Sequence, residues 1–388
     1  MKFQKQPIRI KVLTIVSRMN VGGVSTLLAG LAENINQKDF NHTIITGHCE
    51  NNEVDLLETE KLPCAVIYSK SLKRSIGFID EIKSIIEMRK IITQLNPDIV
   101  HTHTSKAGII GRLAVLSISK KPILIHTYHG HLLYGYFSKR ITFFIILIER
   151  IFAKFTDVLV GDSSQVKQDL LKNKIGTPGK WQVIAPGIRI LPYLPINESR
   201  ISLGLLSNSK IIVWAGRFTD IKDPFLAVQV FANLSRQAKN MKFIMVGGGE
   251  LRLESIALAN KLHVEIMFPG WTNKIENYVS AADLLLLTSK NEGFGMVLAE
   301  AGWYKIPSLS TNVGGVTEFI ENEVTGFLVD RDPIKISDKI LELFDQPEHL
   351  KRVGENASQL VKAKFTSKVF TSQHEFMYKQ IMKKEFTR

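Results

Sequence analysis

Short apolar runs rich in Ile and Val alternate along this chain with segments whose apolar residues recur at helical spacing. In the first half, the runs predict strands at residues 9–16, 43–46, 65–68, 98–101, 123–127, 157–160 and 182–184. Segments with helical spacing and capping-type starts lie between them, at residues 24–34, 80–95, 107–117 and 163–173. This alternation predicts right-handed crossovers and a parallel sheet covered on both faces.

The pattern breaks at residues 185–197, where three prolines and a glycine make the best candidate for a linker. Strands are predicted again at residues 211–215, 243–246, 266–268, 284–288, 307–310 and 326–329, with helices at 225–236, 250–261, 275–281 and 296–303. From residue 347 onwards the chain has helical character without strands. We therefore expect an α/β protein of two doubly wound, Rossmann-like domains, at residues 1–190 and 191–365, with a C-terminal helix at 366–388.

The composition is that of an ordinary soluble globular protein. Of 388 residues, 45% are hydrophobic and 22% charged, which excludes long disorder and fibrous repeats. The two cysteines, Cys49 and Cys64, form no CxxC pair, so a disulfide scaffold and a structural zinc site are not expected. The N-terminus lacks a signal peptide's apolar core, and the most apolar run, residues 141–148, is far shorter than the ~20 residues that cross a bilayer. We expect a cytoplasmic protein.

The net charge of +13 is concentrated in the first half of the chain. Residues 1–190 hold 26 Lys and Arg against 15 Asp and Glu, whereas the remainder holds 24 against 22. A basic half favours an anionic partner, such as phospholipid head groups, nucleic acid or a phosphorylated substrate.

Ligands of open parallel sheets bind at the carboxyl ends of the strands, so residues at these ends are the first candidates for binding and catalysis. After the first predicted strand, Gly22 and Gly23 open a helix and would let backbone N–H groups approach a phosphate or a sugar, although a plain strand-to-helix turn has the same pattern. The full dinucleotide-binding glycine pattern is missing.

Five histidines lie close together at the ends of two predicted strands: His101, His103, His126, His129 and His131. A metal site is one interpretation of this cluster, but no Asp or Glu lies among the five histidines, and we do not favour a metal site. We expect His129 to be a hydrogen-bonding group at a ligand-facing strand end, and His101 and His126 to be core residues.

The second half carries sharper signals. Arg217 follows a predicted strand, and Lys222 lies five residues later, just before a helix. A guanidinium fork and a point charge beside a helix N-terminus suit a diphosphate, and this position favours anion binding over a solvated pair. Further on, the segment Gly293-Phe294-Gly295 precedes another helix and offers a second anion cradle.

Two acidic residues, Glu292 and Glu300, flank the start of that helix. Eight helical residues span roughly 12 Å, and a two-carboxylate hydrolase needs about 5–9.5 Å, so hydrolysis is disfavoured. We expect the pair to bind two ends of one extended ligand. The Asp330-Arg331-Asp332 triplet resembles a metal-binding DxD, but Asp332 precedes Pro333 and a helix, so we predict a helix N-cap and assign no metal.

In combination these residues resemble the retaining glycosyltransferases of family 4, which have the GT-B fold. The resemblance covers nearly the whole chain and is most specific at the E-x7-E motif, matched by Glu292 and Glu300. Support comes from Gly22 and Gly23, from Gly216-Arg217 with Lys222, and from the glycine-rich turn at residues 247–250. The family's usual Pro-Asn-Gly-Ile-Asp linker appears only as Ala-Pro-Gly-Ile-Arg, at residues 185–189.

The resemblance implies two domains that face each other across a cleft, a C-terminal helix that packs back towards the first domain, acceptor binding mainly by residues 1–190 and nucleotide-sugar binding mainly by 191–365. It implies a metal-independent hexosyltransferase that uses a UDP- or GDP-sugar, needs no cofactor and retains the anomeric configuration by a front-face route. The implied sites are the diphosphate site (Gly22, Gly23, Arg217, Lys222, Gly293, Phe294, Gly295), the ribose site (Glu300), the catalytic pair (His129, Glu292) and the nucleobase loop (Gly270, Trp271, Thr272).

The acceptor is expected to be a saccharide or a saccharide linked to a polyprenyl diphosphate, as in surface-polysaccharide biosynthesis. Residues 132–155 mix aromatic and aliphatic side chains with basic ones. We slightly favour a core helix for this segment. The other interpretation is an interfacial helix that, together with residues 70–74, would touch an anionic membrane. One alternative function is an epimerase or phosphorylase on the same fold. A nucleic-acid-binding protein is a second, which no RRM, KH or zinc-finger pattern supports. A dehydrogenase is a third, and the missing dinucleotide-binding glycine pattern opposes it.

Overall fold

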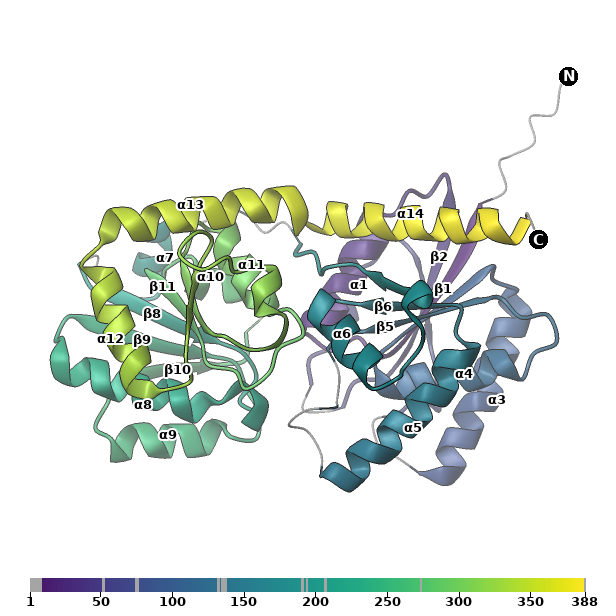
Figure 1. The fold of residues 1–388 in the computed structure, drawn as a ribbon, viewed down its shortest axis with the longest axis horizontal. Coiled ribbons are helices and arrows are strands. Elements are labelled where there is room, and N and C mark those ends of the chain that lie inside the picture. Colours follow the sequence, from purple (N-terminus) through teal and green to yellow (C-terminus); the bar gives the residue numbers. More distant parts are fainter. Residues whose placement is uncertain are drawn as a thin grey trace, which may run out of the picture. The chain divides into compact units, whose positions relative to one another are not determined.

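The structure is a computed structural model that describes residues 9–50, 53–73, 77–130, 133, 138–189, 192, 195–205, 208–272 and 274–386. These residues form two compact units. The amino-terminal unit comprises the described residues up to 189 together with residues 367–386, and the carboxyl-terminal unit comprises residues 192–366. Each unit is built on one parallel sheet, as the strand–helix alternation predicts (Figure 1).

The sheet of the amino-terminal unit has seven strands in the order β3-β2-β1-β4-β5-β6-β7. They are β1 Ile10–Arg18, β2 Phe40–Gly47, β3 Ala65–Tyr68, β4 Ile99–His103, β5 Ile123–Tyr128, β6 Val158–Gly161 and β7 Trp181–Val183. All neighbours pair in parallel. The strand order reverses between β1 and β4, and ligands of such sheets bind beside that reversal, at the carboxyl ends of the strands.

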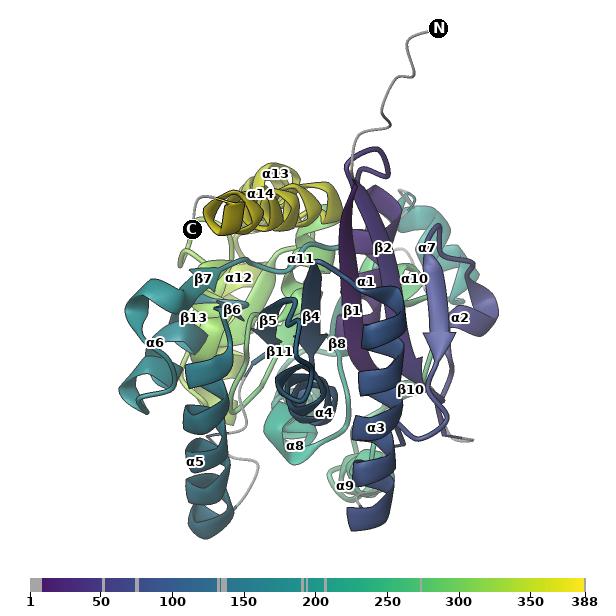
Figure 2. The same cartoon turned by 90° about the vertical axis from the view of Figure 1, so that its right-hand side faces the viewer.

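Helices cover both faces of this sheet. They are α1 Gly23–Asn34, α2 Leu56–Thr59, α3 Phe78–Leu95, α4 Ser105–Leu116, α5 Lys139–Phe155, α6 Ser164–Lys172, the 3₁₀ turn η1 Pro178–Lys180, and α14 Ser367–Phe386. Figure 2 shows α3, α4 and α5 on one face, because the crossovers that lead from β3 to β6 all progress in one direction across the sheet. No described helix, α5 included, combines the length and the apolar character that crossing a bilayer requires.

The C-terminal helix α14 packs against α1 on the opposite face of the same sheet. Gly30 of α1 permits the close approach, since a Cβ atom there would lie 2.9 Å from Cβ of Ser367. The Ser367 amide donates to the Ile188 carbonyl at 2.8 Å, and Lys379 forms an ion pair with Asp39 at 2.7 Å. The end of the chain thus belongs to the amino-terminal unit.

The sheet of the carboxyl-terminal unit has six parallel strands in the order β10-β9-β8-β11-β12-β13. They are β8 Lys210–Ala215, β9 Met241–Val246, β10 Ile266–Gly270, β11 Leu284–Leu287, β12 Ser308–Thr311 and β13 Phe327–Val329. The helices are α7 Ile196–Ser202, α8 Pro224–Gln237, α9 Arg252–Lys261, α10 Ile275–Val279, α11 Met296–Trp303, α12 Pro333–Phe344 and α13 Pro347–Lys364, with 3₁₀ turns η2 Asp220–Lys222 and η3 Gly314–Glu318. The strand order reverses between β8 and β11.

A continuous apolar core fills this unit. Trp214, Phe218, Phe231 and Phe327 are fully buried within it, together with aliphatic residues of α8 and α12. The N-cap prediction for α12 is confirmed: one carboxylate oxygen of Asp332 accepts from two backbone amides at 2.9 Å, and Pro333 begins the helix. The DxD triplet therefore has a structural role at a helix start.

One prediction about the amino-terminal unit is wrong. Residues 139–155 form the helix α5, but the core-helix interpretation holds only for Glu149, Phe152 and Ala153, the three buried residues of the helix. The rest of its surface is half-buried or exposed, because α4 and β5 cover only one side of it. Residues 132 and 134–137 of the same segment, with His131 and Arg74, lie outside the described residues.

Candidate functional site

The predicted donor-binding residues converge at the switch point of the carboxyl-terminal sheet. Arg217 and Lys222 lie in the loop after β8, and Glu292 to Gly295 lie in the loop after β11. These two strands are neighbours at the reversal of strand order. Backbone bonds join the two loops, since the Lys290 amide donates to the Ile221 carbonyl at 2.8 Å. Residues 70 positions apart in sequence are thereby held side by side.

Lys222 and Glu292 form the centre of this cluster. The Lys222 Nζ atom donates to Oε1 of Glu292 at 2.5 Å, and the Ser289 hydroxyl donates to the same oxygen at 2.6 Å. The Glu292 side chain is 7% exposed and that of Lys222 is 24% exposed. A partly exposed ammonium group that rests on a buried carboxylate is held in place by its partner while its remaining N–H bonds can face a ligand.

Arg217 offers a second cation in the same loop. Its side chain is exposed, and it has no ion-pair partner among the residues that the structure describes. A guanidinium that no carboxylate occupies is available for a bidentate contact with a phosphate.

The start of α11 supplies backbone donors to the same loop. Gly295 is the N-cap residue, has a left-handed backbone with φ of 83°, and provides no side-chain cap. The first N–H groups of a helix have no partner within the helix, so they remain for an anion. The Phe294 side chain is buried against Phe319 and Phe365, so this residue can offer a ligand only its backbone.

Glu300 lies on α11 and is half-buried. Burial raises the pKa of this carboxyl from 4.5 to about 7, and the nearby Glu276 carboxylate on α10 shifts it in the same direction. Hydroxyl groups that donate hydrogen bonds to Glu300 would stabilise its charged form. The two hydroxyls of a diol could therefore offset the cost of burying this carboxylate.

The predicted nucleobase loop lies beside the Arg217 loop. The Gly247 amide donates to the Gly270 carbonyl at 2.9 Å, and the Phe218 amide donates to the Gly248 carbonyl at 2.8 Å. The half-exposed indole ring of Trp271 packs directly on Gly248, where a Cβ atom would lie 2.2 Å from the ring. Thr272 follows and its hydroxyl caps the Lys274 amide at 3.0 Å. The flat ring beside the cationic loop is suited to stacking on a base.

In the amino-terminal unit, Gly22 and Gly23 lie after β1, at the edge of the switch point. Gly22 is the N-cap of α1, has an extended backbone and gives no side-chain cap. A Cβ atom at this position would meet no protein atom closer than 3.8 Å, so the packing of the unit does not require glycine here. A glycine that packing does not require is compatible with the predicted close approach of a ligand to this backbone.

His129 follows β5 and is held by two neighbours. Its Nδ1 atom lies 3.3 Å from Oδ2 of Asp162, and its Nε2 atom lies 2.9 Å from Nδ1 of His103. Both ring nitrogens are therefore engaged within the protein. Sequence reasoning missed Asp162, whose only signal was its position directly after the sixth strand of the sheet.

His101 and His126 are satisfied core residues, as predicted. The ring nitrogens of His101 bond to the hydroxyls of Tyr378 and Thr127, both at 2.7 Å, and His126 bonds to the Thr102 hydroxyl at 2.8 Å. Burial lowers the pKa of both residues, and of His103, well below 6.5. Within the described ranges, no three His, Cys, Asp or Glu side chains are grouped as metal ligands.

Comparison with known proteins shows the family. The pattern for "Glycosyltransferase Family 4" matches residues 21–190, and that for "Glycosyl transferases group 1" matches residues 195–360. The chain is 30% identical, over 273 residues, to the UDP-Gal:alpha-D-GlcNAc-diphosphoundecaprenol alpha-1,3-galactosyltransferase of Escherichia coli, a match that covers 68% of this chain and 70% of that protein. The chain belongs to the family 4 glycosyltransferases.

Other relatives extend the match to almost the full length of this glycosyltransferase. The capsular polysaccharide biosynthesis glycosyltransferase CapM of Staphylococcus aureus is 24% identical over 370 residues, 92% of this chain and 94% of that protein. Two solved structures share the fold at 20–21% identity: sucrose-phosphate synthase from Thermosynechococcus elongatus (TM-score 0.83; 96% and 99% of the two chains) and Anabaena Alr3699/HepE with UDP and glucose (TM-score 0.80; 96% and 100%). The predicted GT-B fold is confirmed.

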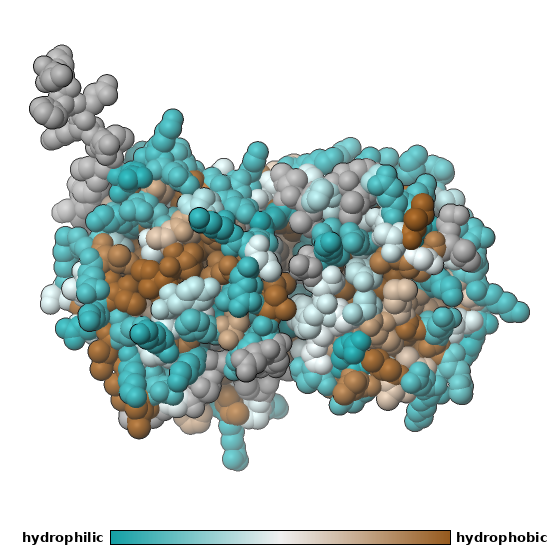
Figure 3. Space-filling view, turned by 180° about the vertical axis from the view of Figure 1, so that it is seen from behind, coloured by the Kyte–Doolittle hydropathy of each residue, from teal (hydrophilic) through white to brown (hydrophobic). Residues whose placement is uncertain are grey.

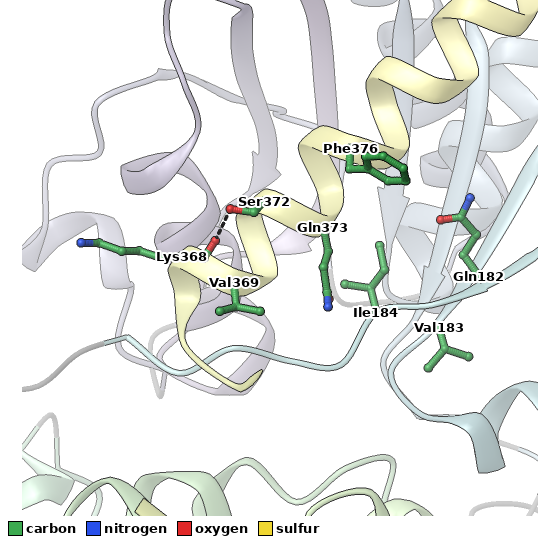
Figure 4. A pocket seen from close by; sticks show the side chains of 8 residues that line it. All are labelled: Gln182, Val183, Ile184, Lys368, Val369, Ser372, Gln373 and Phe376. Atoms are coloured by element: carbon green, nitrogen blue, oxygen red, sulfur yellow. Dashed lines mark hydrogen bonds between the residues drawn. The ribbon is translucent and has the colours of Figure 1, made fainter. Parts of the chain in front are cut away.

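A cavity of about 500 Å³ lies elsewhere in the amino-terminal unit of the glycosyltransferase, between the end of β7 and α14 (Figure 4). It is lined by Gln182, Val183, Ile184, Lys368, Val369, Ser372, Gln373 and Phe376. None of these is a predicted donor or catalytic residue, so the cavity is separate from the candidate site.

Proposed function

We propose that this glycosyltransferase transfers a hexosyl group from a UDP- or GDP-sugar to a hydroxyl group of a lipid-linked saccharide, with retention of the anomeric configuration. The observation that carries the proposal is the Lys222–Glu292 pair at the switch point, beside the exposed Arg217 and the uncapped start of α11. Cations, helix amides and a paired carboxylate on one loop cluster suit an activated sugar, which combines a diphosphate with hydroxyl groups.

Each group of the donor has a proposed partner. Arg217, Lys222 and the amides of Gly293, Phe294 and Gly295 bind the diphosphate. Glu300 accepts from the ribose hydroxyls, Glu292 contacts the hydroxyls of the donor sugar, and the residues 270–272 border the base. The solved Anabaena protein with UDP and glucose has the same fold, which supports a nucleotide-sugar donor.

The bond changes follow from these contacts. The bond between the anomeric carbon and the phosphate oxygen breaks, and its electron pair leaves with the nucleoside diphosphate. The acceptor hydroxyl attacks from the same face and gives its proton to the departing phosphate oxygen. Arg217, Lys222 and the amides of α11 stabilise the negative charge that develops, so the proposed route needs no metal ion.

The amino-terminal unit is proposed to bind the acceptor. From the family resemblance we assign Gly22 and Gly23 to the diphosphate site and His129 to the catalytic residues. Because Asp162 and His103 engage the His129 ring, we favour a role of the adjacent backbone in contacting the sugar. The name of the Escherichia coli relative specifies a diphosphoundecaprenol acceptor, and that of CapM specifies capsular polysaccharide, which supports an acceptor linked to a polyprenyl diphosphate. The surplus of 11 positive charges in residues 1–190 favours such an anionic acceptor and a peripheral location on an anionic membrane.

Calorimetric titration of the protein with UDP, GDP, ADP and CMP tests the donor assignment. One nucleoside diphosphate is expected to bind in buffer with EDTA, and Arg217→Ala is expected to weaken it. Proton NMR of the product reports the anomeric configuration. Conversion of the donor without any acceptor would instead support the epimerase alternative, and undiminished binding by Arg217→Ala would contradict the site.

A further inference from the structure

The helix α5 is fixed to its unit by one side only. Glu149 on its inner side accepts two hydrogen bonds from the Arg112 guanidinium of α4, each at 2.8 Å, and a third from the Tyr128 hydroxyl at 2.6 Å. The same guanidinium lies over the ring of Phe152, 4.5 Å from its centre. This buried ion pair holds the helix rigidly while its outer side faces away from the core.

The outer side of α5 is apolar along its whole length. Five large side chains recur at intervals of three and four residues and form one stripe: Ile141, Phe144, Ile148, Ile151 and Phe155. Each is 41–62% exposed, and Phe143 and Leu147 beside them are 60% and 44% exposed. Single exposed apolar residues are ordinary on protein surfaces, whereas a contiguous stripe marks an interaction surface.

The charges around the stripe are basic. Lys139, Arg140 and Lys154 are exposed, and Arg150 is half-buried. The one acidic residue of the helix, Glu149, is buried in its ion pair with Arg112. The outer side of α5 therefore presents large apolar groups beside positive charge and no carboxylate.

The helix α3 repeats only the apolar part of this pattern at its start, since it also carries Asp80, Glu81 and Glu87, which are half-buried. Ile79, Ile82 and Ile86 are 68%, 43% and 62% exposed, and the exposed Arg89 and Lys90 follow them. Figure 2 shows α3 and α5 on the same face of the sheet, on either side of α4. The hydropathy-coloured surface in Figure 3 shows apolar side chains along the lower edge of the amino-terminal unit, over α3.

We propose that the outer faces of α3 and α5 together form a lipid-binding surface that inserts into an anionic phospholipid bilayer. Large apolar side chains flanked by Lys and Arg, with no acidic residue on the outer side of α5, match the head-group and acyl boundary of such a bilayer. Both helices follow strands of a parallel sheet, so they begin at its carboxyl edge, where Gly22 and His129 lie. This inference rests on the proposed function, because a lipid-binding surface would bring the enzyme to a lipid-linked acceptor.

Flotation of the full chain with vesicles of phosphatidylethanolamine and phosphatidylglycerol tests the surface. The parent is expected to float with these vesicles, and less with phosphatidylcholine or at high salt. The triple variant Phe144→Ser/Ile148→Ser/Ile151→Ser is expected to lose at least about tenfold in partitioning, and Ile79→Ser/Ile86→Ser a smaller part. The matched control Ile201→Ser/Leu253→Ser/Ile334→Ser removes side chains of the carboxyl-terminal unit that are 77%, 74% and 62% exposed, and should float like the parent.

A spectroscopic variant reports insertion directly. Phe144→Trp is expected to shift its emission to the blue with anionic vesicles, and Ile201→Trp is not. Equal flotation of the parent, the triple variant and the control would overturn the proposal. So would a parent that does not float but forms a dimer that the triple variant loses in sedimentation, because the face would then join two copies of the chain.

The surface and the proposed function can fail separately. Nucleotide binding by the triple variant is expected to equal that of the parent, because none of the three substituted residues is assigned to the nucleotide site. If the parent floats but transfers sugar only to a soluble acceptor, the lipid-linked acceptor is wrong and the lipid-binding surface stands. If it transfers sugar to a lipid-linked acceptor in detergent and never floats, the surface is wrong and the function stands.

Discussion

The Nζ atom of Lys222 lies 2.5 Å from Oε1 of Glu292, across 70 positions of sequence. The sequence motifs assign separate roles to the two residues: Lys222 is predicted to bind the phosphate and Glu292 to bind the sugar. The structure joins them into one charged pair, which the Ser289 hydroxyl supports at 2.6 Å. Removal of either residue therefore affects the other, because the remaining partner loses its main ion pair.

Lys222→Ala and Glu292→Gln are each expected to lower kcat/KM by about 10²–10³, since each disturbs the stabilisation of the departing diphosphate. The double variant should lose much less than the product of the two effects, because the residues act as a unit. Steady-state kinetics with the donor varied measures this. Lys290→Ala is the control: Lys290 pairs with the exposed Asp220 at 2.5 Å, and loss of such a surface pair should leave kcat/KM unchanged. Independent, multiplicative losses would contradict the coupling.

Glu300→Gln is expected to stabilise the protein above neutral pH while it weakens nucleotide binding. The raised pKa of about 7 means that the folded state binds a proton more tightly than the unfolded state. The free energy of unfolding therefore falls as the pH rises from 4.5 to 7, and the cost at pH 8 is at most about 3 kcal/mol. Thermal unfolding at pH 5 and pH 8, with calorimetry against the nucleotide, measures both effects. Equal melting temperatures of parent and variant at pH 8 would refute the first part.

Asp162→Ala is expected to lower kcat by roughly 10- to 100-fold with little change in the KM of the donor. Asp162 anchors the His129 ring and with it the adjacent backbone that is proposed to contact the sugar, and a small displacement of such a contact is costly. Asp162 touches none of the residues assigned to the diphosphate, so the KM of the donor should change little. Asp162→Asn, whose amide oxygen can still accept from His129, should recover most of the loss. A rise in KM alone, or no recovery by Asn, would argue against this positioning role.

The amino-terminal unit is expected to be acid-labile. Burial lowers the pKa of His42 and His374 to about 4, and that of three further histidines well below 6.5. Each lowered pKa contributes stability that is complete above pH about 6.5 and is lost as the pH falls, by about 1.4 kcal/mol per pH unit for each histidine. Urea unfolding at a series of pH values measures this slope. His374→Gln should flatten it, and the exposed His263→Gln should not.

Local pattern was sufficient for the elements and for the class of fold. Strand runs such as the predicted 211–215 agree with β8 to within a residue, because a strand covered on both faces needs a continuous apolar run. The N-cap at Asp332 was equally readable, since the cap and its proline are adjacent in sequence. The loop residues 217, 222 and 292–295 could be placed at strand ends, where parallel sheets bind ligands.

Contacts between distant segments could not be read from local pattern. The hydrogen bonds of His129 with Asp162 and His103 join the ends of three strands, and no residue near His129 in the sequence predicts these partners. The helix α5 was ambiguous for the same reason: its apolar residues are compatible with burial or exposure, and the coverage by α4 and β5 decides which side is inside.

The sequence by itself determined the alternation of strands and helices, the family and the residue types at the strand ends, because these depend on periodicity and on neighbours along the chain. Tertiary structure alone decided that Lys222 rests on Glu292, that both ring nitrogens of His129 are occupied, and that the stripe on α5 faces outwards. The physical reason is that ion pairs, hydrogen bonds and burial depend on distances in space, which the order of strands in the sheet sets.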